Sequence, residues 1–349
     1  MSLRSLISLS EAQFPCFWGI DIGGTNIKIG LVDHTGQTIR FYSIPTLEPD
    51  GAQAAVDRTS ATICKLEEEL RLSHEQIPQI GLGSPGSMDL SKGLLLEPPN
   101  LPNWRCFAIR QAFEQALGRP VTFLNDANAA AYGEFWLGSG RHHNSMILLT
   151  LGTGVGGGII VDDQLINGVN SFGSECGHII VDSRDDAELC VWGGGRGQLE
   201  AYASASGVVR RTRQRLHQGA MSRLAGLLGA GQDELTAKQV FLAATDCDAL
   251  ALEIIDETAR WLGIGITTLV HTIDPGMVVL GGAMNFGGKD SPVGQRFLSS
   301  IRREFKSRSF GNVFENTAIG FAALGGDAGY LGAAGYARRE HLGEMARME

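Results

Sequence analysis

Phe17-Trp18-Gly19-Ile20-Asp21-Ile22-Gly23-Gly24-Thr25 joins an apolar run to a glycine turn. The run predicts a buried strand that ends at Asp21, and the alternation of Ile27, Ile29 and Leu31 with polar or small residues predicts the partner strand of a hairpin. Glycine provides 47 of the 349 residues and clusters in short turns of this kind. Such clustering indicates tight turns beside an anionic ligand.

The second half of the chain repeats this pattern. An apolar strand at 146–151 enters a glycine turn, and residues 159–161 provide its partner. The repeat predicts two related domains: a small α/β domain over 1–124, completed by the C-terminal helix 326–349, and a larger α/β domain over 125–325. No linker rich in proline, serine or charge separates them, so they should hinge as rigid bodies.

Apolar periodicity predicts the elements between the hairpins. Further strands are expected at 38–42, 79–82 and 277–280, and helices at 56–70, 107–117, 199–217 and 248–270.

The composition excludes several classes of protein. With 29 basic and 38 acidic residues the net charge is -9, whereas nucleic-acid-binding proteins usually carry a basic face. The arginines between 210 and 215 are expected on the solvated face of a helix. Six scattered cysteines do not resemble a disulfide framework, Met1–Pro15 lacks the apolar block of a signal peptide, and no segment is apolar enough to span a bilayer. We therefore expect a soluble, cytoplasmic protein that binds neither nucleic acid nor membrane.

Leu124-Asn125-Asp126-Ala127-Asn128-Ala129-Ala130 places one carboxylate between an apolar run and an alanine-rich segment with helical propensity. Asp126 is therefore expected at a strand-to-helix junction, where rigid elements support an exposed side chain. An aspartate at such a place can act as a catalytic base. Alternatively, it is simply the N-cap of the helix.

The glycine turns are candidates for phosphate binding. Gly152-Thr153-Gly154-Val155-Gly156-Gly157 matches the dinucleotide fingerprint, but that motif requires a helix directly after it and a strand follows here. The chain has neither a Walker A motif nor the catalytic loop of protein kinases. What remains is a pair of hairpin turns whose backbone amides can converge on phosphate oxygens, with hydroxyls from Thr25 and Thr153. Their matching positions indicate a nucleotide.

These motifs together resemble the ROK family of repressors, open reading frames and kinases, within the actin-like ATPase superfamily. The two glycine turns are similar to the phosphate motifs of actin-like sugar kinases. The similarity covers about residues 18–335, and its further motifs are 99–104, 124–134, 173–179, 199–207 and 278–282. The resemblance implies a two-domain actin-like (ribonuclease H-like) sugar kinase fold with an interdomain cleft.

The activity implied by the resemblance is that of an ATP-dependent hexose kinase of the glucokinase branch, with Mg-ATP as phosphate donor. The residue that matches Asp126 is the general base in this family. The residues that match sugar-binding positions are Gly86, Ser87, Asn100, Asn125, Glu175, His178 and Glu200. The expected nucleotide-binding residues are Asp21, Gly23, Gly24, Thr25, Gly152, Thr153, Gly154, Gly281 and Gly282. Asp21 is also expected to hold magnesium through water. Taken alone, a histidine before Ile-Ile-Val is more often a core residue, but Glu175 and the resemblance favour a sugar-binding role for His178.

The chain departs from the family at a zinc knuckle. Many ROK proteins carry three cysteines just before the glutamate that corresponds to Glu200, with the histidine that corresponds to His178 as fourth ligand. The residues at those cysteine positions here are Val191, Gly193 and Gln198. Cys190 is one place out of register, and one thiolate with one imidazole cannot assemble four-coordinate zinc. We expect no structural zinc and a loop ordered by packing of Trp192 and its neighbouring glycines.

Several alternatives stay open. Glucose is favoured by the segment 200–207, while fructose, mannose, N-acetylmannosamine and N-acetylglucosamine are the other candidate substrates. A non-catalytic, sugar-sensing ROK regulator would carry an added N-terminal helix-turn-helix domain, for which the roughly twenty residues before Asp21 are too few. A sugar-binding protein without catalysis is disfavoured by Asp21, Asp126 and the glycine turns. Similar kinases are commonly dimers, so a homodimer is expected.

Overall fold

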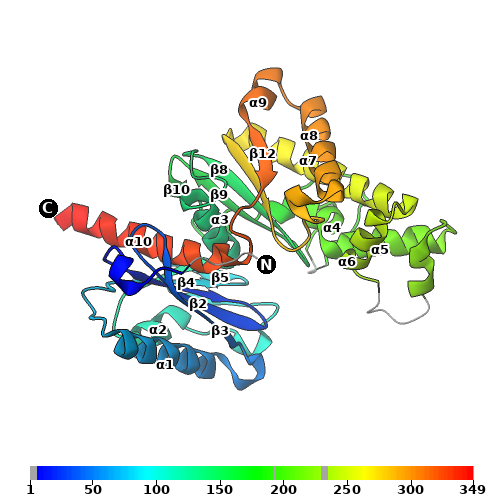
Figure 1. Ribbon diagram of the computed structural model, residues 1–349. Coiled ribbons are helices and arrows are strands. Elements are labelled where there is room, and N and C mark those ends of the chain that lie inside the picture. The colour runs from blue at the N-terminus through cyan, green and yellow to red at the C-terminus, as the bar shows by residue number, and fades with distance from the viewer. Residues whose placement is uncertain (1–5, 192–193, 229–234, 349) are drawn as a thin grey trace.

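Two five-stranded sheets of the same topology organise the chain, in a computed structural model that describes residues 6–191, 194–228 and 235–348 (Figure 1). The first sheet has the order β3-β2-β1-β4-β7 and the second the order β10-β9-β8-β11-β12. In each sheet an antiparallel hairpin, β1–β2 or β8–β9, continues into two parallel strands. The predicted duplication of the hairpin therefore extends to whole sheets.

The strands of the first sheet are β1 (Phe17–Ile22), β2 (Asn26–Val32), β3 (Thr38–Pro45), β4 (Ile80–Ser84) and β7 (Val121–Asn125). Those of the second are β8 (Met146–Leu151), β9 (Val155–Val161), β10 (Gln164–Leu165), β11 (Met277–Gly281) and β12 (Ala318–Phe321). A separate small ribbon pairs β5 (Met88–Asp89) with β6 (Leu94–Leu95). Parallel strands end at the same edge of a sheet, so the segments that follow β4, β7 and β11 meet at one side of each lobe.

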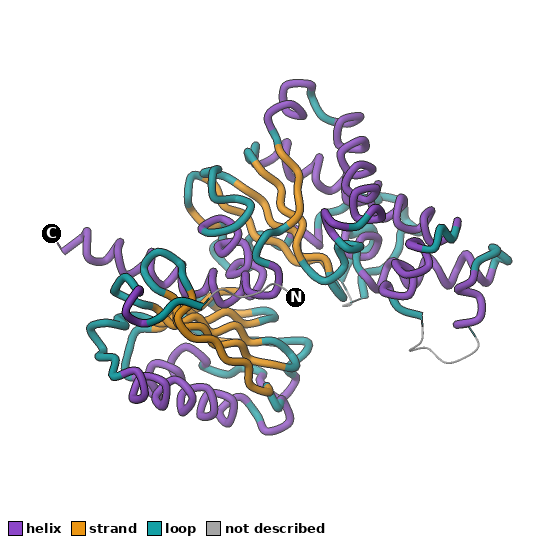
Figure 2. The backbone as a smooth tube through the Cα atoms, viewed as in Figure 1, coloured by secondary structure: helices purple, strands orange, loops and turns teal. Residues whose placement is uncertain are grey.

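Helices cover both faces of the first sheet (Figures 1 and 2). The helices α1 (Ala52–Leu70) and α2 (Ile109–Leu117) lie on one face, and α10 (Ala328–Met348) lies on the other. The approach of α10 is close, because a Cβ on Gly19 or Gly81 would lie 1.9 Å from a backbone oxygen of α10. The C-terminal helix thus joins the first sheet, and we call this unit the first lobe. The division of the chain at 124/125, with the C-terminal helix added to the first domain, stays a prediction.

The second lobe comprises the second sheet and the helices between β7 and β12. These are α3 (Asp126–Trp136), α4 (Leu199–Ala203), α5 (Ala205–His217), α6 (Ala237–Thr245), α7 (Ala249–Ile273), α8 (Pro292–Arg308) and α9 (Gly311–Asn316). The single helix predicted over 199–217 is wrong. The chain breaks at Ser204, whose side chain accepts a hydrogen bond from the Gly207 N–H at 3.1 Å and so caps α5.

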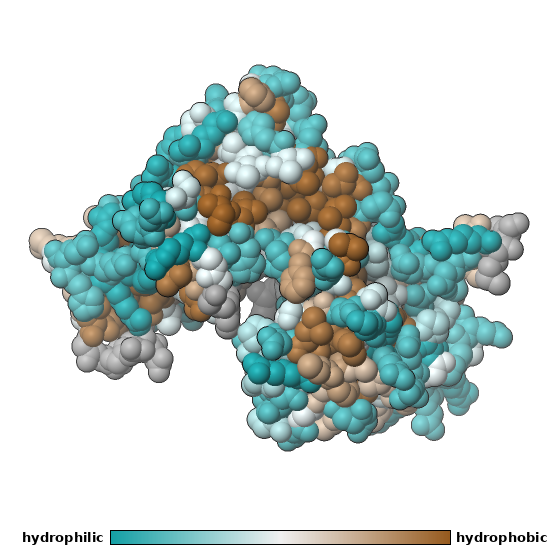
Figure 3. All heavy atoms as spheres, turned by 180° about the vertical axis from the view of Figure 1, so that it is seen from behind, coloured by the Kyte–Doolittle hydropathy of each residue, from teal (hydrophilic) through white to brown (hydrophobic). Residues whose placement is uncertain are grey.

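Each lobe has its own large apolar core. The face of the molecule opposite to that in Figure 1 is mainly hydrophilic, with apolar patches over both lobes (Figure 3). Within the described ranges, every helix is too short or too polar to cross a bilayer. The six cysteines, all of which are described, form no disulfide.

Candidate active site

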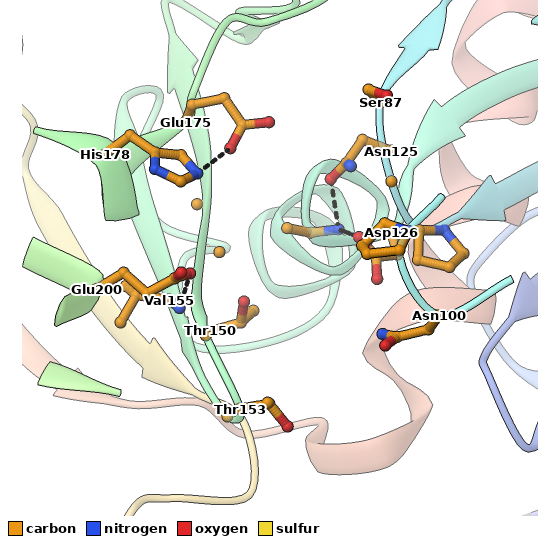
Figure 4. Close-up of a pocket in the computed structure, with 18 of the residues that line it drawn as sticks. Ser87, Asn100, Asn125, Asp126, Thr150, Thr153, Val155, Glu175, His178 and Glu200 are labelled. Carbon is orange, nitrogen blue, oxygen red and sulfur yellow. Dashed lines mark hydrogen bonds and ion pairs between the residues drawn. The ribbon is translucent and has the colours of Figure 1, made fainter. Parts of the chain in front are cut away.

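A cleft of about 800 Å³ lies between the lobes and collects most of the predicted site residues. Those that line it are Gly86, Ser87, Asn100, Asn125, Asp126, Gly152, Thr153, Gly154, Glu175, His178, Glu200 and Gly282. Figure 4 shows Asn100, Asn125 and Asp126 on one wall and, facing them, Glu175, His178 and Glu200. Residues as far apart in the sequence as Gly86 and Gly282 thus meet in one cleft, as the resemblance implies.

Asp126 lies at the start of α3, directly after β7. The N-cap of α3 is Asn125, whose Oδ1 accepts hydrogen bonds from the N–H groups of Ala127 at 2.9 Å and Asn128 at 3.4 Å. The interpretation of Asp126 as the N-cap is therefore wrong. The Asp126 carboxylate accepts a hydrogen bond from the Ala127 N–H at 2.8 Å and lines the cleft.

Burial raises the pKa values of two carboxyl groups, those of Asp126 and Asp21. Desolvation, helped by the negative charges of Asp21 and Glu175 and opposed by the Ala127 N–H, raises the pKa of Asp126 to about 6. Burial also raises the pKa of Asp21, and Lys28, whose Nζ lies 3.5 Å from Asp21 Oδ2, partly offsets that rise. Asp126 therefore combines a raised basicity with a largely ionised state at neutral pH.

The opposite wall presents hydrogen-bond acceptors. Burial raises the pKa of Glu175, and its Oε2 lies 3.9 Å from His178 Nε2. The His178 side chain is 38% exposed, so it is not a core residue. Glu200 is buried, and its Oε2 accepts a hydrogen bond from the Val155 N–H at 2.9 Å. Carboxylates and an imidazole in this arrangement suit the hydroxyls of a sugar ring.

The second glycine turn lines the cleft, whereas the first does not. Gly152–Gly154 and Gly282 are lining residues, and the Gly152 N–H closes the turn on the Gly154 carbonyl at 2.9 Å. The predicted nucleotide-binding residues outside the lining are Asp21, Gly23, Gly24, Thr25 and Gly281. Gly24 is nevertheless a neighbour of the cleft wall, because a Cβ on it would lie 3.5 Å from that of Asn100. The nucleotide role of these residues stays a prediction.

The lining residues missed from the sequence include Glu97, Arg105, Thr150 and Phe172. Glu97 and Arg105 flank the motif 99–104, and Thr150 precedes the second glycine turn. Their position next to a motif is therefore the feature of the sequence that could have indicated them as site residues. Phe172 is 53% exposed beside Gly173, and a single apolar side chain at the surface is not by itself a signal of a site.

The surroundings of His178 do not provide a set of zinc ligands. His178 Nδ1 lies 3.0 Å from Gln198 Oε1, an amide oxygen at a position where the family resemblance implies a cysteine. Among the described residues, three or more His, Cys, Asp or Glu side chains nowhere come together as a metal site. Trp192 and Gly193 lie outside the described residues. This donor set does not fit structural zinc, and metal analysis of the purified protein tests that prediction.

Known proteins share this architecture. The sequence profile of the ROK family matches residues 17–340. A glucokinase from Halalkalibacterium halodurans is 35% identical over 314 residues, which are 90% of this chain and 92% of that protein. The structure of a ROK family glucokinase from Streptomyces griseus in complex with glucose and AMPPNP has a TM-score of 0.73 and 34% identity, covering 93% of this chain and 99% of that one. A xylose repressor from Caldicellulosiruptor bescii is 31% identical, with 90% of this chain and 76% of the repressor covered. The expected two-domain sugar kinase fold is confirmed.

Proposed function

This chain belongs to the ROK family, and we propose that it is an ATP-dependent hexose kinase of the glucokinase type with Asp126 as general base. The observation that carries the proposal is the position of Asp126. It stands at a rigid strand-to-helix junction, inside a cleft that also contains the acceptor wall and a glycine turn. A base that accepts the proton of the acceptor hydroxyl is one of the groups that transfer of a phosphoryl group to an alcohol uses.

In the proposed reaction Asp126 accepts the proton of a sugar hydroxyl. The hydroxyl oxygen forms a bond to the terminal phosphorus of ATP, the bond from that phosphorus to the bridging oxygen breaks, and ADP leaves. Closure of the lobes around the sugar would exclude water, the competing acceptor. The proposed sugar ligands are Gly86, Ser87, Asn100, Asn125, Glu175, His178 and Glu200.

The proposed nucleotide site joins both glycine turns. Gly152–Gly154 lines the cleft on the second lobe, and Gly23–Thr25 would reach the phosphates from the first lobe when the lobes close. Magnesium commonly binds through one or two carboxylates, several waters and substrate phosphates, and Asp21 fits that role. When bound, the ion would neutralise charge on the phosphates of ATP.

Sugar-dependent release of ADP from Mg-ATP, measured across a panel of hexoses, tests the function and identifies the substrate. We expect turnover with glucose. Asp126→Asn should reduce turnover by roughly 10²–10⁴-fold while largely sparing sugar binding, because the amide cannot accept the proton. Asp163→Asn, in an exposed loop of the second lobe, is the matched control. Near-full activity of Asp126→Asn would contradict the role of Asp126 as general base.

The second candidate is a sugar-sensing regulator, favoured by the match to the xylose repressor. Tight sugar binding without ADP release for any hexose would support it over the kinase. Homodimeric assembly and a cytoplasmic location stay predictions.

A further inference from the structure

Glu175, His178 and Glu200 form the wall of the cleft that is proposed to bind the sugar, here called the sugar wall. The segment just before Glu200 is paired through its backbone with the segment that follows His178. Ile180 forms an isolated bridge with Gln198, and the Leu199 N–H donates to the Ile179 carbonyl at 2.9 Å. Gly197 permits this approach: it has φ +76°, and a Cβ on it would lie 1.8 Å from the Asp182 carbonyl oxygen. The pairing fixes the Gln198 backbone beside the segment that carries His178.

Two side chains of this loop reach two side chains of the sugar wall. Gln198 Oε1 lies 3.0 Å from His178 Nδ1. The Cys190 thiol donates to Glu200 Oε1 at 2.9 Å, and both Cys190 and Glu200 are buried. Since the Val155 N–H already donates to Glu200 Oε2, the Glu200 carboxylate is anchored from both oxygens.

The contact to Gln198 determines which nitrogen of His178 carries the proton. An amide oxygen can only accept, so the Nδ1 of a neutral His178 must donate to it. The lone pair then lies on Nε2, the nitrogen on the side of Glu175. His178 and Glu175 would both accept hydrogen bonds from neighbouring hydroxyls (Figure 4).

We propose that Gln198 and Cys190 are positioning residues for sugar recognition: they fix the tautomer of His178 and the orientation of Glu200 by hydrogen bonds alone, without a metal ion. Only the kinetic test of this inference, the change in the sugar KM, rests on the proposed kinase function. The competing interpretation is that both contacts merely stabilise the loop, in which case their loss would lower the melting temperature and leave recognition of the sugar unchanged.

Nitrogen NMR of the histidine rings tests the tautomer directly in the full-length protein, with the His178 signals assigned through His178→Gln. We expect the Nδ1–H form in the wild type and a shift toward Nε2–H in Gln198→Met, which keeps the length of the side chain and removes its acceptor. An Nε2–H tautomer in the wild type, or the same tautomer in both proteins, would overturn the proposal. The NMR measurement does not depend on catalysis, so it tests the positioning role of Gln198 even if no hexose is phosphorylated.

Steady-state kinetics then separates positioning from loop stability. Gln198→Met should raise the sugar KM about tenfold, the effect of one lost hydrogen bond, and leave the ATP KM within about twofold. Gln218→Met, at an exposed position after α5, is the matched control. Cys190→Val should also raise the sugar KM, and Cys190→Ser, which keeps a donor, should restore it. A lower melting temperature with an unchanged sugar KM in both Gln198→Met and Cys190→Val would refute the positioning role.

Discussion

Asn125 and Asp126 divide two tasks that a single carboxylate would have to combine. A helix start needs a side-chain oxygen to accept its first N–H groups, and a catalytic base needs an oxygen directed at substrate. Asn125 takes the first task through its contacts with Ala127 and Asn128. Asp126, one residue later, keeps its carboxylate on the cleft, where burial and Asp21 raise its pKa. Asp126 Oδ1 also accepts from the Ala127 N–H, so the helix start holds the base at the cleft while Asn125 provides the cap.

The raised pKa of Asp126 predicts the acid limb of the activity profile. Its folded value is about 6 rather than 3.8, so protonation begins to remove the base as the pH falls below neutrality. We expect kcat/KM for the sugar to be level above about pH 7 and to fall about tenfold for each pH unit well below 6. Initial rates at saturating Mg-ATP in buffers of constant ionic strength measure this, and a profile that stays flat down to pH 5 would contradict it.

The residues that line this site could be predicted from the motifs, but the choice of cap and the side-chain contacts behind His178 could not. An Asn-Asp pair between an apolar run and alanines identifies a helix start, but both residue types are good N-caps, so the pattern does not say which one caps. The contact of His178 with Gln198 depends on a single bridge at Ile180. An isolated pair of residues leaves no periodicity to recognise. The sequence indicates only that Gln198 stands where the family resemblance implies a cysteine, and it does not indicate the contact with His178.

Among the elements, α3 and the segment before α10 matter most, because the chain crosses between the lobes at these two places. Glu134 on α3 is fully buried. Its Oε1 accepts from the Leu324 N–H at 2.7 Å, and its Oε2 accepts from the N–H groups of Ala323 at 3.0 Å and Ser139 at 2.9 Å. One carboxylate therefore ties both crossings together, next to the close packing of α3 on α10.

Glu134→Gln should destabilise the protein by about 2–4 kcal/mol. The amide NH₂ would face backbone N–H donors, and at least one buried donor would lose its acceptor. Chemical denaturation, followed by circular dichroism, measures the change in the free energy of unfolding. Glu344→Gln, at an exposed position of α10, is the control and should stay within about 0.5 kcal/mol of the wild type. Equal stability of the two variants would show that Glu134 does not tie the crossings.

Most elements with a strong apolar period are predicted from the sequence, with α8 as the exception, and short elements without a period are not. The hairpin strands and α7 have long apolar patterns. The edge strand β12 has only four residues, too few to establish alternation. α8 was overlooked although Val293, Phe297, Ile301 and Phe305 recur at intervals of four and are all buried. The break between α4 and α5 depends on the cap at Ser204. The apolar residues on both sides of Ser204 follow the pattern of one continuous helix, so the pattern does not indicate the break.

At the scale of the whole molecule, the cleft lies between two lobes that each have a large apolar core, and a smaller buried cluster joins α3 and the second sheet to α10. The contact between the Leu90 N–H and Ser171 Oγ, at 2.9 Å, already joins them beside the cleft. Since the proposed sugar ligands come from both lobes, a bound sugar adds contacts to each. A ligand that binds the native state alone stabilises it by mass action, about 2.7 kcal/mol at one hundred times its Kd.

A bound hexose should therefore raise the thermal stability of both lobes together. At one hundred times its Kd we expect the calorimetric melting temperature to rise by roughly 3–6 °C, and any separate transitions of the lobes to move closer together. Asp126→Asn should keep this shift, because the base is not needed for binding. A hexose that gives no ADP release in the panel is the negative control. If only one of two transitions moved, the sugar would be held by one lobe, and the assignment of ligands to both walls of the cleft would be wrong.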